Sequence, residues 1–132
     1  MKKAQASMDL LIVLGVMLVV FAILFQTIVA DRITERIEKE VLLDAKSQAE
    51  KVAMAVNEVY LGGASTNKTF YLPEQLVNSK DYNLTIYDSG TVICENMGKR
   101  ESVSILTSKL TTTILNDSWN TIKNEEGVII FG

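Results

Sequence analysis

A run of apolar residues near the N-terminus constrains this chain more than any other feature of its sequence. Leu10 to Phe25 contains sixteen consecutive apolar or glycine residues, and the run continues through Gln26 and Thr27 to Ala30. Twenty-one residues of helix rise about 31 Å, which is the thickness of the hydrocarbon core of a bilayer. A helix on the surface of a globular core would carry a polar stripe, and this run carries none. We therefore expect the segment to lie in lipid or in an equally apolar core.

The remaining composition limits the classes of function. The chain has 132 residues, 13 Lys or Arg against 16 Asp or Glu, no His and one Cys. Its net charge of −3 argues against a nucleic-acid partner, because nucleic-acid binders normally carry a basic surplus. Without His, and with Cys94 alone, we expect no zinc site, no internal disulfide and no His-assisted nucleophile. We also find no glycine-rich phosphate loop, so we expect a structural or binding protein, not an enzyme, without catalytic, cofactor or metal sites.

The residues before the apolar run do not form an ordinary secretory signal. Such a signal places a small-x-small cleavage site after its apolar stretch, whereas here an acid and a base follow Ala30 directly. Instead, two lysines and Ala4 are followed by the short polar patch Gln5–Asp9, and only then by the run. An acid beside a membrane-spanning segment is costly unless it finds a partner, so the presence of Asp9 requires an explanation.

The segment Lys3-Ala4-Gln5-Ala6-Ser7-Met8-Asp9-Leu10 resembles the class III signal peptide of archaeal type IV pilin-like proteins. In that family a prepilin peptidase in the membrane cuts before the Gln, on the cytoplasmic side, and the apolar helix stays on the mature protein. The resemblance implies cleavage between Ala4 and Gln5 and an N-terminus that begins in the cytoplasm. Two positions depart from the family pattern: Ala4 replaces a usual Gly, and Asp9 replaces a usual Glu.

Cleavage at this position would give Asp9 a partner. It creates a positively charged amine at Gln5, one helical turn before Asp9. A staggered neighbouring copy could then bring its amine to this carboxylate inside an apolar bundle, where a matched pair is strong and an unmatched charge is costly. The alternative interpretation is that Asp9 borders a membrane anchor, with Ser7 as the N-cap of the helix.

The sequence predicts that the helix continues beyond the apolar run to about Leu61. Apolar residues recur at spacings of three and four between Ile33 and Val59, with charged residues between them, as in an amphipathic helix. Gly62 and Gly63 supply the expected C-terminal stop. This second half of the helix has an apolar stripe that must pack on another element.

Residues 64–132 are rich in Ser, Thr and Asn and show the alternation of β-strands. We predict a three-stranded meander over Tyr82–Thr107, an edge strand at Phe70–Leu72 and a C-terminal strand at Val128–Phe131 that is buried on both faces. The stretch from Thr111 to Ile122 could be strand or helix. Because sixty-nine residues form a marginal core, we expect this small antiparallel sheet to pack on the stripe from Val41 to Val59.

Several residues of this predicted β head are candidate sites. The Asn-x-Ser/Thr triplets at Asn67, Asn83 and Asn116 are candidate N-glycosylation sites, with Asn67 and Asn116 expected in loops. We expect Cys94 to be a buried structural thiol. For the aromatic residues Tyr71, Tyr87 and Trp119, we favour core positions over an adhesive surface patch.

These observations predict an α+β fold like that of type IV pilins. We divide the chain into a leader (1–4), a membrane and assembly helix (5–30), an amphipathic continuation (31–63) and a β-rich extracellular head (64–132). The resemblance implies a structural subunit of an archaeal type IV pilus-like surface filament that serves adhesion or another surface role, with the prepilin peptidase and further copies of the chain as partners. Other pilins or a surface ligand are further candidate partners. The precursor would lie in the cytoplasmic membrane and the mature protein in an extracellular filament.

A second class of function stays open. The chain could be a single-pass membrane protein that does not polymerise, or a minor filament component, whose head binds a partner at the cell surface. A membrane-tethered enzyme is disfavoured by the missing catalytic groups. Archaellins share the architecture, but their usual processing site lacks the Gln-x-Ser pattern found at Gln5 to Ser7.

Overall fold

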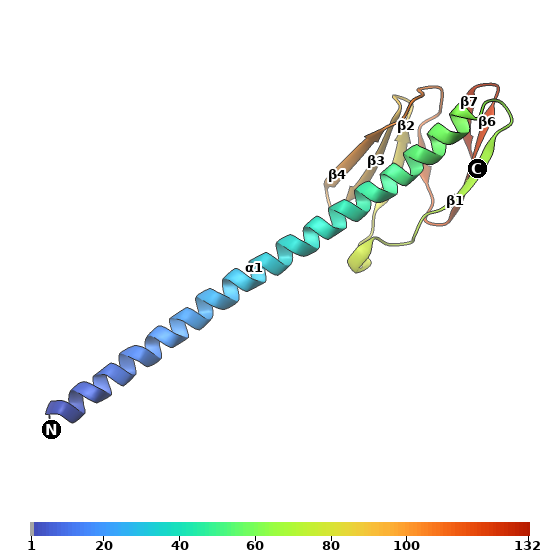
Figure 1. Cartoon of the computed structure of the whole chain (residues 1–132). Coiled ribbons are helices and arrows are strands. Elements are labelled where there is room, and N and C mark those ends of the chain that lie inside the picture. Colours follow the sequence, from blue (N-terminus) through green and yellow to red (C-terminus); the bar gives the residue numbers. More distant parts are fainter. Residues whose placement is uncertain (1) are drawn as a thin grey trace. The chain divides into compact units, whose positions relative to one another are not determined.

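The computed structural model describes residues 2–132, and these form one long α-helix followed by seven short β-strands in two antiparallel sheets (Figure 1). The chain divides into a first unit that ends at Glu38 and a second unit, Lys39–Gly132. An α+β fold with a long apolar N-terminal helix and a small antiparallel β domain is therefore confirmed.

Helix α1 extends from Lys2 to Leu61. It begins before the predicted start, so Ser7 lies inside the helix, and its interpretation as the N-cap is wrong. The predicted end is confirmed. Gly62 donates its backbone N–H to the Glu58 carbonyl over 2.9 Å, and Gly63 takes a φ of +81°, which glycine adopts without strain.

The first strand after the helix forms a three-stranded sheet with the last two strands of the chain. Strand β1 (Asn67–Tyr71) pairs with β6 (Trp119–Glu125), which pairs with β7 (Val128–Phe131), in the order β1-β6-β7. The edge position predicted for Phe70 and Tyr71 is confirmed, whereas Leu72 follows the strand. A short 3₁₀ turn, η1 (Val77–Ser79), leads to the second sheet.

The second sheet contains the predicted meander. Its order is β4-β3-β2-β5, with β2 (Asn83–Tyr87), β3 (Thr91–Asn96), β4 (Lys99–Ser104) and β5 (Thr113–Leu115). Met97 and Gly98 connect β3 to β4 with φ values of +47° and +80°, the left-handed pair that a tight hairpin turn requires. The ambiguous stretch from Thr111 to Ile122 is extended, because it supplies β5 and the start of β6.

Two predictions about the β region are wrong. We expected one sheet, and the structure has two. The Ile129 N–H of β7 also donates to the carbonyl of Lys109, in the segment between β4 and β5, over 2.9 Å. We also expected β7 to be buried on both faces. It lies at the edge of its sheet and buries Ile129, while Val128 and Ile130 are 43% and 40% exposed.

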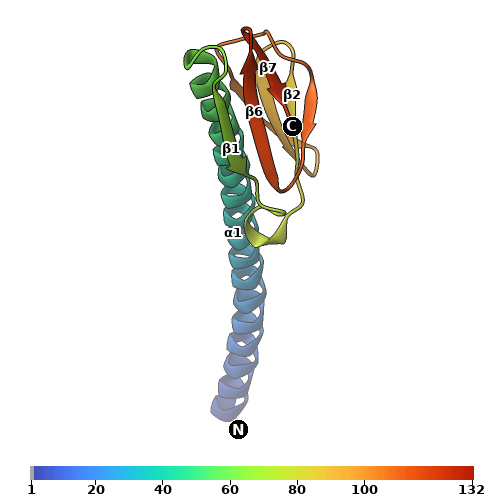
Figure 2. The same cartoon turned by 90° about the vertical axis from the view of Figure 1, so that its right-hand side faces the viewer.

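Within the second unit, both sheets pack on one face of α1 (Figures 1 and 2). The predicted apolar stripe is buried from Val41 onward, and the face also includes Ala53 and Ala55. Most of its members are small: Val41, Ala45, Ala49, Val52, Ala53, Ala55, Val56 and Val59. Leu84, Ile86, Val92, Ile122 and Ile129 of the sheets fill the core against it, each at most 1% exposed.

Polar side chains join the helix to the β region at defined positions. Asn124 in β6, which is 2% exposed, donates to the Val59 carbonyl over 3.3 Å and accepts from the Gly127 N–H over 2.8 Å. Asn57 accepts from the Leu106 N–H over 2.8 Å. Asp44 accepts from the Val77 N–H, also over 2.8 Å. The bonds of Asn124, Asn57 and Asp44 thus join α1 to β6, to the segment after β4 and to η1.

Candidate functional site

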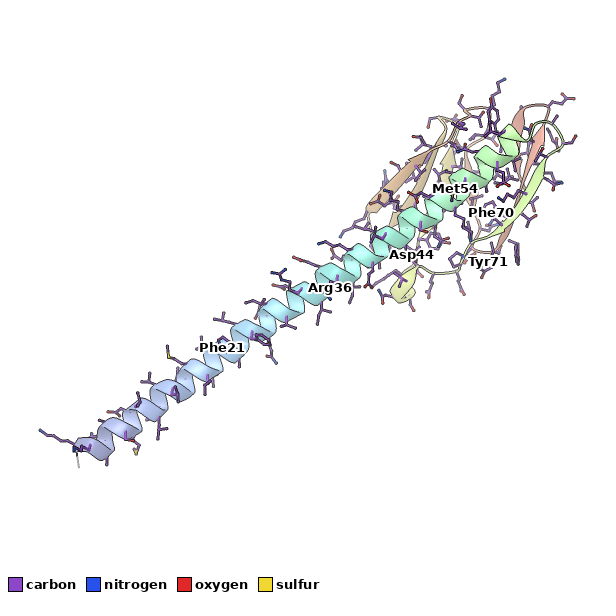
Figure 3. All side chains as sticks on the ribbon, in the orientation of Figure 1. Phe21, Arg36, Asp44, Met54, Phe70 and Tyr71 are labelled. Carbon is purple, nitrogen blue, oxygen red and sulfur yellow. The ribbon has the colours of Figure 1, made fainter. Side chains whose placement is uncertain are left out.

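The apolar segment of α1 is exposed on every side. All described residues up to Glu40 are exposed, and the large apolar side chains between Met8 and Val29 keep 38–69% of their surface accessible. Figure 3 shows side chains projecting from all around this part of the helix, Phe21 among them. The helix is long and apolar enough to cross a membrane. Contiguous apolar surface of this size is not tolerated in water, so it needs lipid or another apolar surface against it.

The two threonines in and just after this segment donate hydrogen bonds to the helix backbone. The Thr27 hydroxyl donates to the Ile23 carbonyl over 3.0 Å, and the Thr34 hydroxyl donates to the Ala30 carbonyl over the same distance. Because the hydroxyl donates to the preceding turn, its proton stays hydrogen-bonded when the threonine is buried in an apolar environment. Thr27 therefore does not interrupt the apolar surface in the way that a hydrated hydroxyl would.

Gln5 and Asp9 lie in the first turns of α1, both exposed, four residues and about one turn apart. They therefore share a face of the helix, at the cytoplasmic end that the leader resemblance implies. Their charge pairing between copies, and cleavage between Ala4 and Gln5, stay predictions.

The three candidate glycosylation asparagines are all exposed. Asn116 lies in the loop between β5 and β6, as expected. Asn67 is the first residue of β1 instead of a loop residue, and Asn83 is the first residue of β2. Exposure makes each side chain reachable by a modifying enzyme, and modification itself stays a prediction.

The expectation of core positions for the three aromatic residues is wrong. Trp119 is 69% exposed and Tyr71 is 45% exposed. Their rings lie next to each other across β1 and β6, with centroids 5.4 Å apart and ring planes tilted by 58°. Tyr87, in the other sheet, is 39% exposed. The alternation along β6 could have predicted this exposure. Trp119 points to the same face as Thr121 and Lys123, which is the face opposite to the buried Ile122.

The geometry of β1 explains why Tyr71 stands at the surface. The Lys51 ammonium of α1 donates to the Tyr71 carbonyl over 2.7 Å and so fixes the end of the strand. Phe70, one residue earlier, points to the opposite face and is 5% exposed (Figure 3). Thr69 and Thr121, the next outward pair in the register, share a hydrogen bond of 3.2 Å. The outer face of β1 and β6 thus presents two aromatic rings beside two hydroxyls.

Cys94 is fully buried in β3, as expected for a structural thiol. Burial raises its pKa from 9.0 to about 12, and the carboxylates of Asp44 and Glu101 add to the increase. The thiol therefore stays protonated and unreactive at physiological pH. Within residues 2–132 no group of three or more His, Cys, Asp or Glu side chains is arranged to hold a metal ion.

We predict that the native protein resists alkylation of Cys94. At pH 8 a maleimide should react with the folded chain at least about 100-fold more slowly than with the chain in urea, because thiol reactivity follows the accessible thiolate. Intact mass after timed quenching measures both rates, and Cys94→Ala controls for modification elsewhere. Comparable rates in the two states would contradict the buried position.

The raised pKa also has a consequence for stability. The folded state holds the proton of the Cys94 thiol more tightly than the unfolded state does. The stability of the fold is therefore unaffected by this group below about pH 9, and the free energy of unfolding falls as the pH rises from there towards 12.

No family model, no curated protein and no solved structure matches this chain. Its function therefore has to be inferred from its own residues and their arrangement.

Proposed function

We propose that this protein is the structural subunit of an archaeal type IV pilus-like surface filament, assembled through residues 5–30 of α1. The observation that carries the proposal is the apolar surface from Leu10 to Val29, unbroken as far as Phe25 and exposed on every side of the helix. Packing each large aliphatic side chain against neighbouring copies would stabilise the assembly by about 1.5–3 kcal/mol relative to water. The leader-like segment Lys3–Leu10 supports a filament subunit over other apolar helices.

Asp9 favours assembly with other copies over permanent residence of the single chain in the membrane. A carboxylate at the border of an apolar segment gains nothing from hydrocarbon and loses hydration there. After cleavage at Gln5, the amine of a staggered neighbour would lie at the level of this carboxylate. A wrongly registered copy would leave both charges unmatched, so the pair would select the correct stagger.

The head supports an adhesive use of such a filament. Trp119 and Tyr71 form an exposed ring pair on a sheet face, and large exposed aromatic side chains are typical of contact sites. Each ring combines apolar area with a polar tip, which suits attachment to both apolar and hydroxyl-rich surfaces.

Recovery of native filaments tests the main proposal. Material sheared from cells that express the full chain should contain filaments by electron microscopy, and N-terminal sequencing of their subunit should begin at Gln5. A chain that starts at Met1 and stays in the membrane fraction would instead identify the non-polymerising anchor. A mature chain that lacks residues 10–30 would exclude both.

Asp9→Ala tests the charge pair. We expect normal membrane insertion and normal cleavage but at least about a tenfold loss of filaments, because the amine of a neighbour would lose its only carboxylate at that level. Asp9→Glu, which keeps the charge, should restore most of the yield. Immunoblots of membrane and sheared fractions separate insertion from assembly. Wild-type filament yield in Asp9→Ala would remove this mechanism.

Trp119→Ala tests the adhesive surface. Because the indole is 69% exposed, we expect the unfolding free energy to change by less than about 1.5 kcal/mol, while filament-dependent attachment of cells to a surface falls several-fold. Met97→Ala removes another apolar side chain, 83% exposed, at the β3–β4 turn and is the matched control. Equal attachment by both variants would argue against the aromatic pair as the contact.

A further inference from the structure

Four charged residues directly after the apolar segment are sorted by sign around α1. Asp31 and Glu35 are one turn apart and lie along one face of the helix. Arg32 and Arg36 follow each of them by one position, which rotates them by about 100° onto the neighbouring face. All four side chains are exposed, and Figure 3 shows Arg36 projecting from the helix. We call the first pair the acidic row and the second pair the basic row.

Within each row the two charges are alike and four residues apart, so they repel, whereas opposite charges at that spacing attract. One turn further on, Lys39 follows the acidic row and Glu40 follows the basic row. The same helix uses the favourable spacing further along, where Lys46 and Glu50 approach to 4.0 Å. Within the described part of the chain, no ion-pair partner lies within 4.0 Å of the acidic row or the basic row. The two rows are therefore complementary to each other but do not satisfy each other within one copy.

We propose that the acidic row of one copy binds the basic row of a neighbouring copy and so helps to fix the stagger between subunits. This inference rests on the proposed filament function and names a second contact within it. Because both rows are carried by every copy, the contact repeats along the assembly. Exposed charge pairs contribute mainly to register and specificity, which is the property that a helical polymer requires at this level.

A lipid surface explains these residues less well. Anionic headgroups would attract the basic row, but they would repel the acidic row that lies beside it at the same level. A second copy of the chain satisfies both rows, since it presents both signs. We therefore assign the rows to contact between copies.

Charge reversal and its compensation test this assignment in cells that make filaments from the full-length chain. Arg32→Glu/Arg36→Glu makes both rows acidic, and Asp31→Arg/Glu35→Arg makes both basic. We expect each double variant to lower the yield of sheared filaments at least tenfold, with cleavage at Gln5 and membrane levels unchanged. Combining all four substitutions exchanges the rows and should return the yield to within about twofold of wild type. Co-expression of the two double variants should also restore it.

A matched control uses the charge pair that is satisfied within one copy. Exchanging its charges, by Lys46→Glu/Glu50→Lys, should leave the filament yield unchanged. Normal assembly of either double variant, or no recovery in the fourfold variant, would overturn the proposal. Loss confined to the arginine variant, with release from the membrane, would assign the basic row to lipid instead. If the wild-type chain forms no filaments, the proposed function fails first, and the two results are thereby distinguished.

Discussion

The main physical constraint on this protein is that the apolar surface from Leu10 to Val29 has to be kept out of water. No element of the first unit covers this surface, and all its side chains are exposed. Apart from the amide of Gln26, the segment offers water few polar groups, because the hydroxyl of Thr27 is already bonded to the helix. This surface therefore needs lipid or another apolar surface against it.

The charged residues beside the apolar surface can be interpreted in terms of that constraint. Charges inside an apolar assembly are tolerated only with partners, so in the proposed filament Asp9 would restrict which arrangements of copies are stable. The charged rows begin where the apolar run ends, in a hydrated region where ion pairs discriminate between registers more than they add affinity. Apolar burial would supply the energy of association, and the charges would choose among otherwise similar packings. This division suits a helix whose apolar surface has little pattern of its own.

Sequence reasoning recovered the parts of the fold that local physics determines. The end of α1 followed from Gly62 and Gly63, and the meander followed from strict alternation and from turn residues. It failed where the outcome depends on partners distant in the chain. The run Val128–Phe131 has no polar residue, so its sequence could not show that β7 lies at a sheet edge with two side chains exposed.

The candidate sites divide in the same way. Exposure of the apolar segment and burial of Cys94 followed from composition and pattern. The pairing of Tyr71 with Trp119 joins residues 48 positions apart, and only the β1–β6 register brings them together. General preferences for aromatic residues pointed to the core, while the alternation within β6 pointed outward. The local pattern was the better guide, because β6 contributes only one face to the interior.

The alanines on the buried face of α1 have a consequence for how this protein can change over time. Ala45, Ala49, Ala53 and Ala55 meet the sheets with single methyl groups, and larger side chains there would overpack the interior. The outward residues of β1 and β4 have no such restriction, since they contact solvent. Substitutions should therefore be tolerated on the outward faces of these strands, while the helix beneath them keeps the same inner surface.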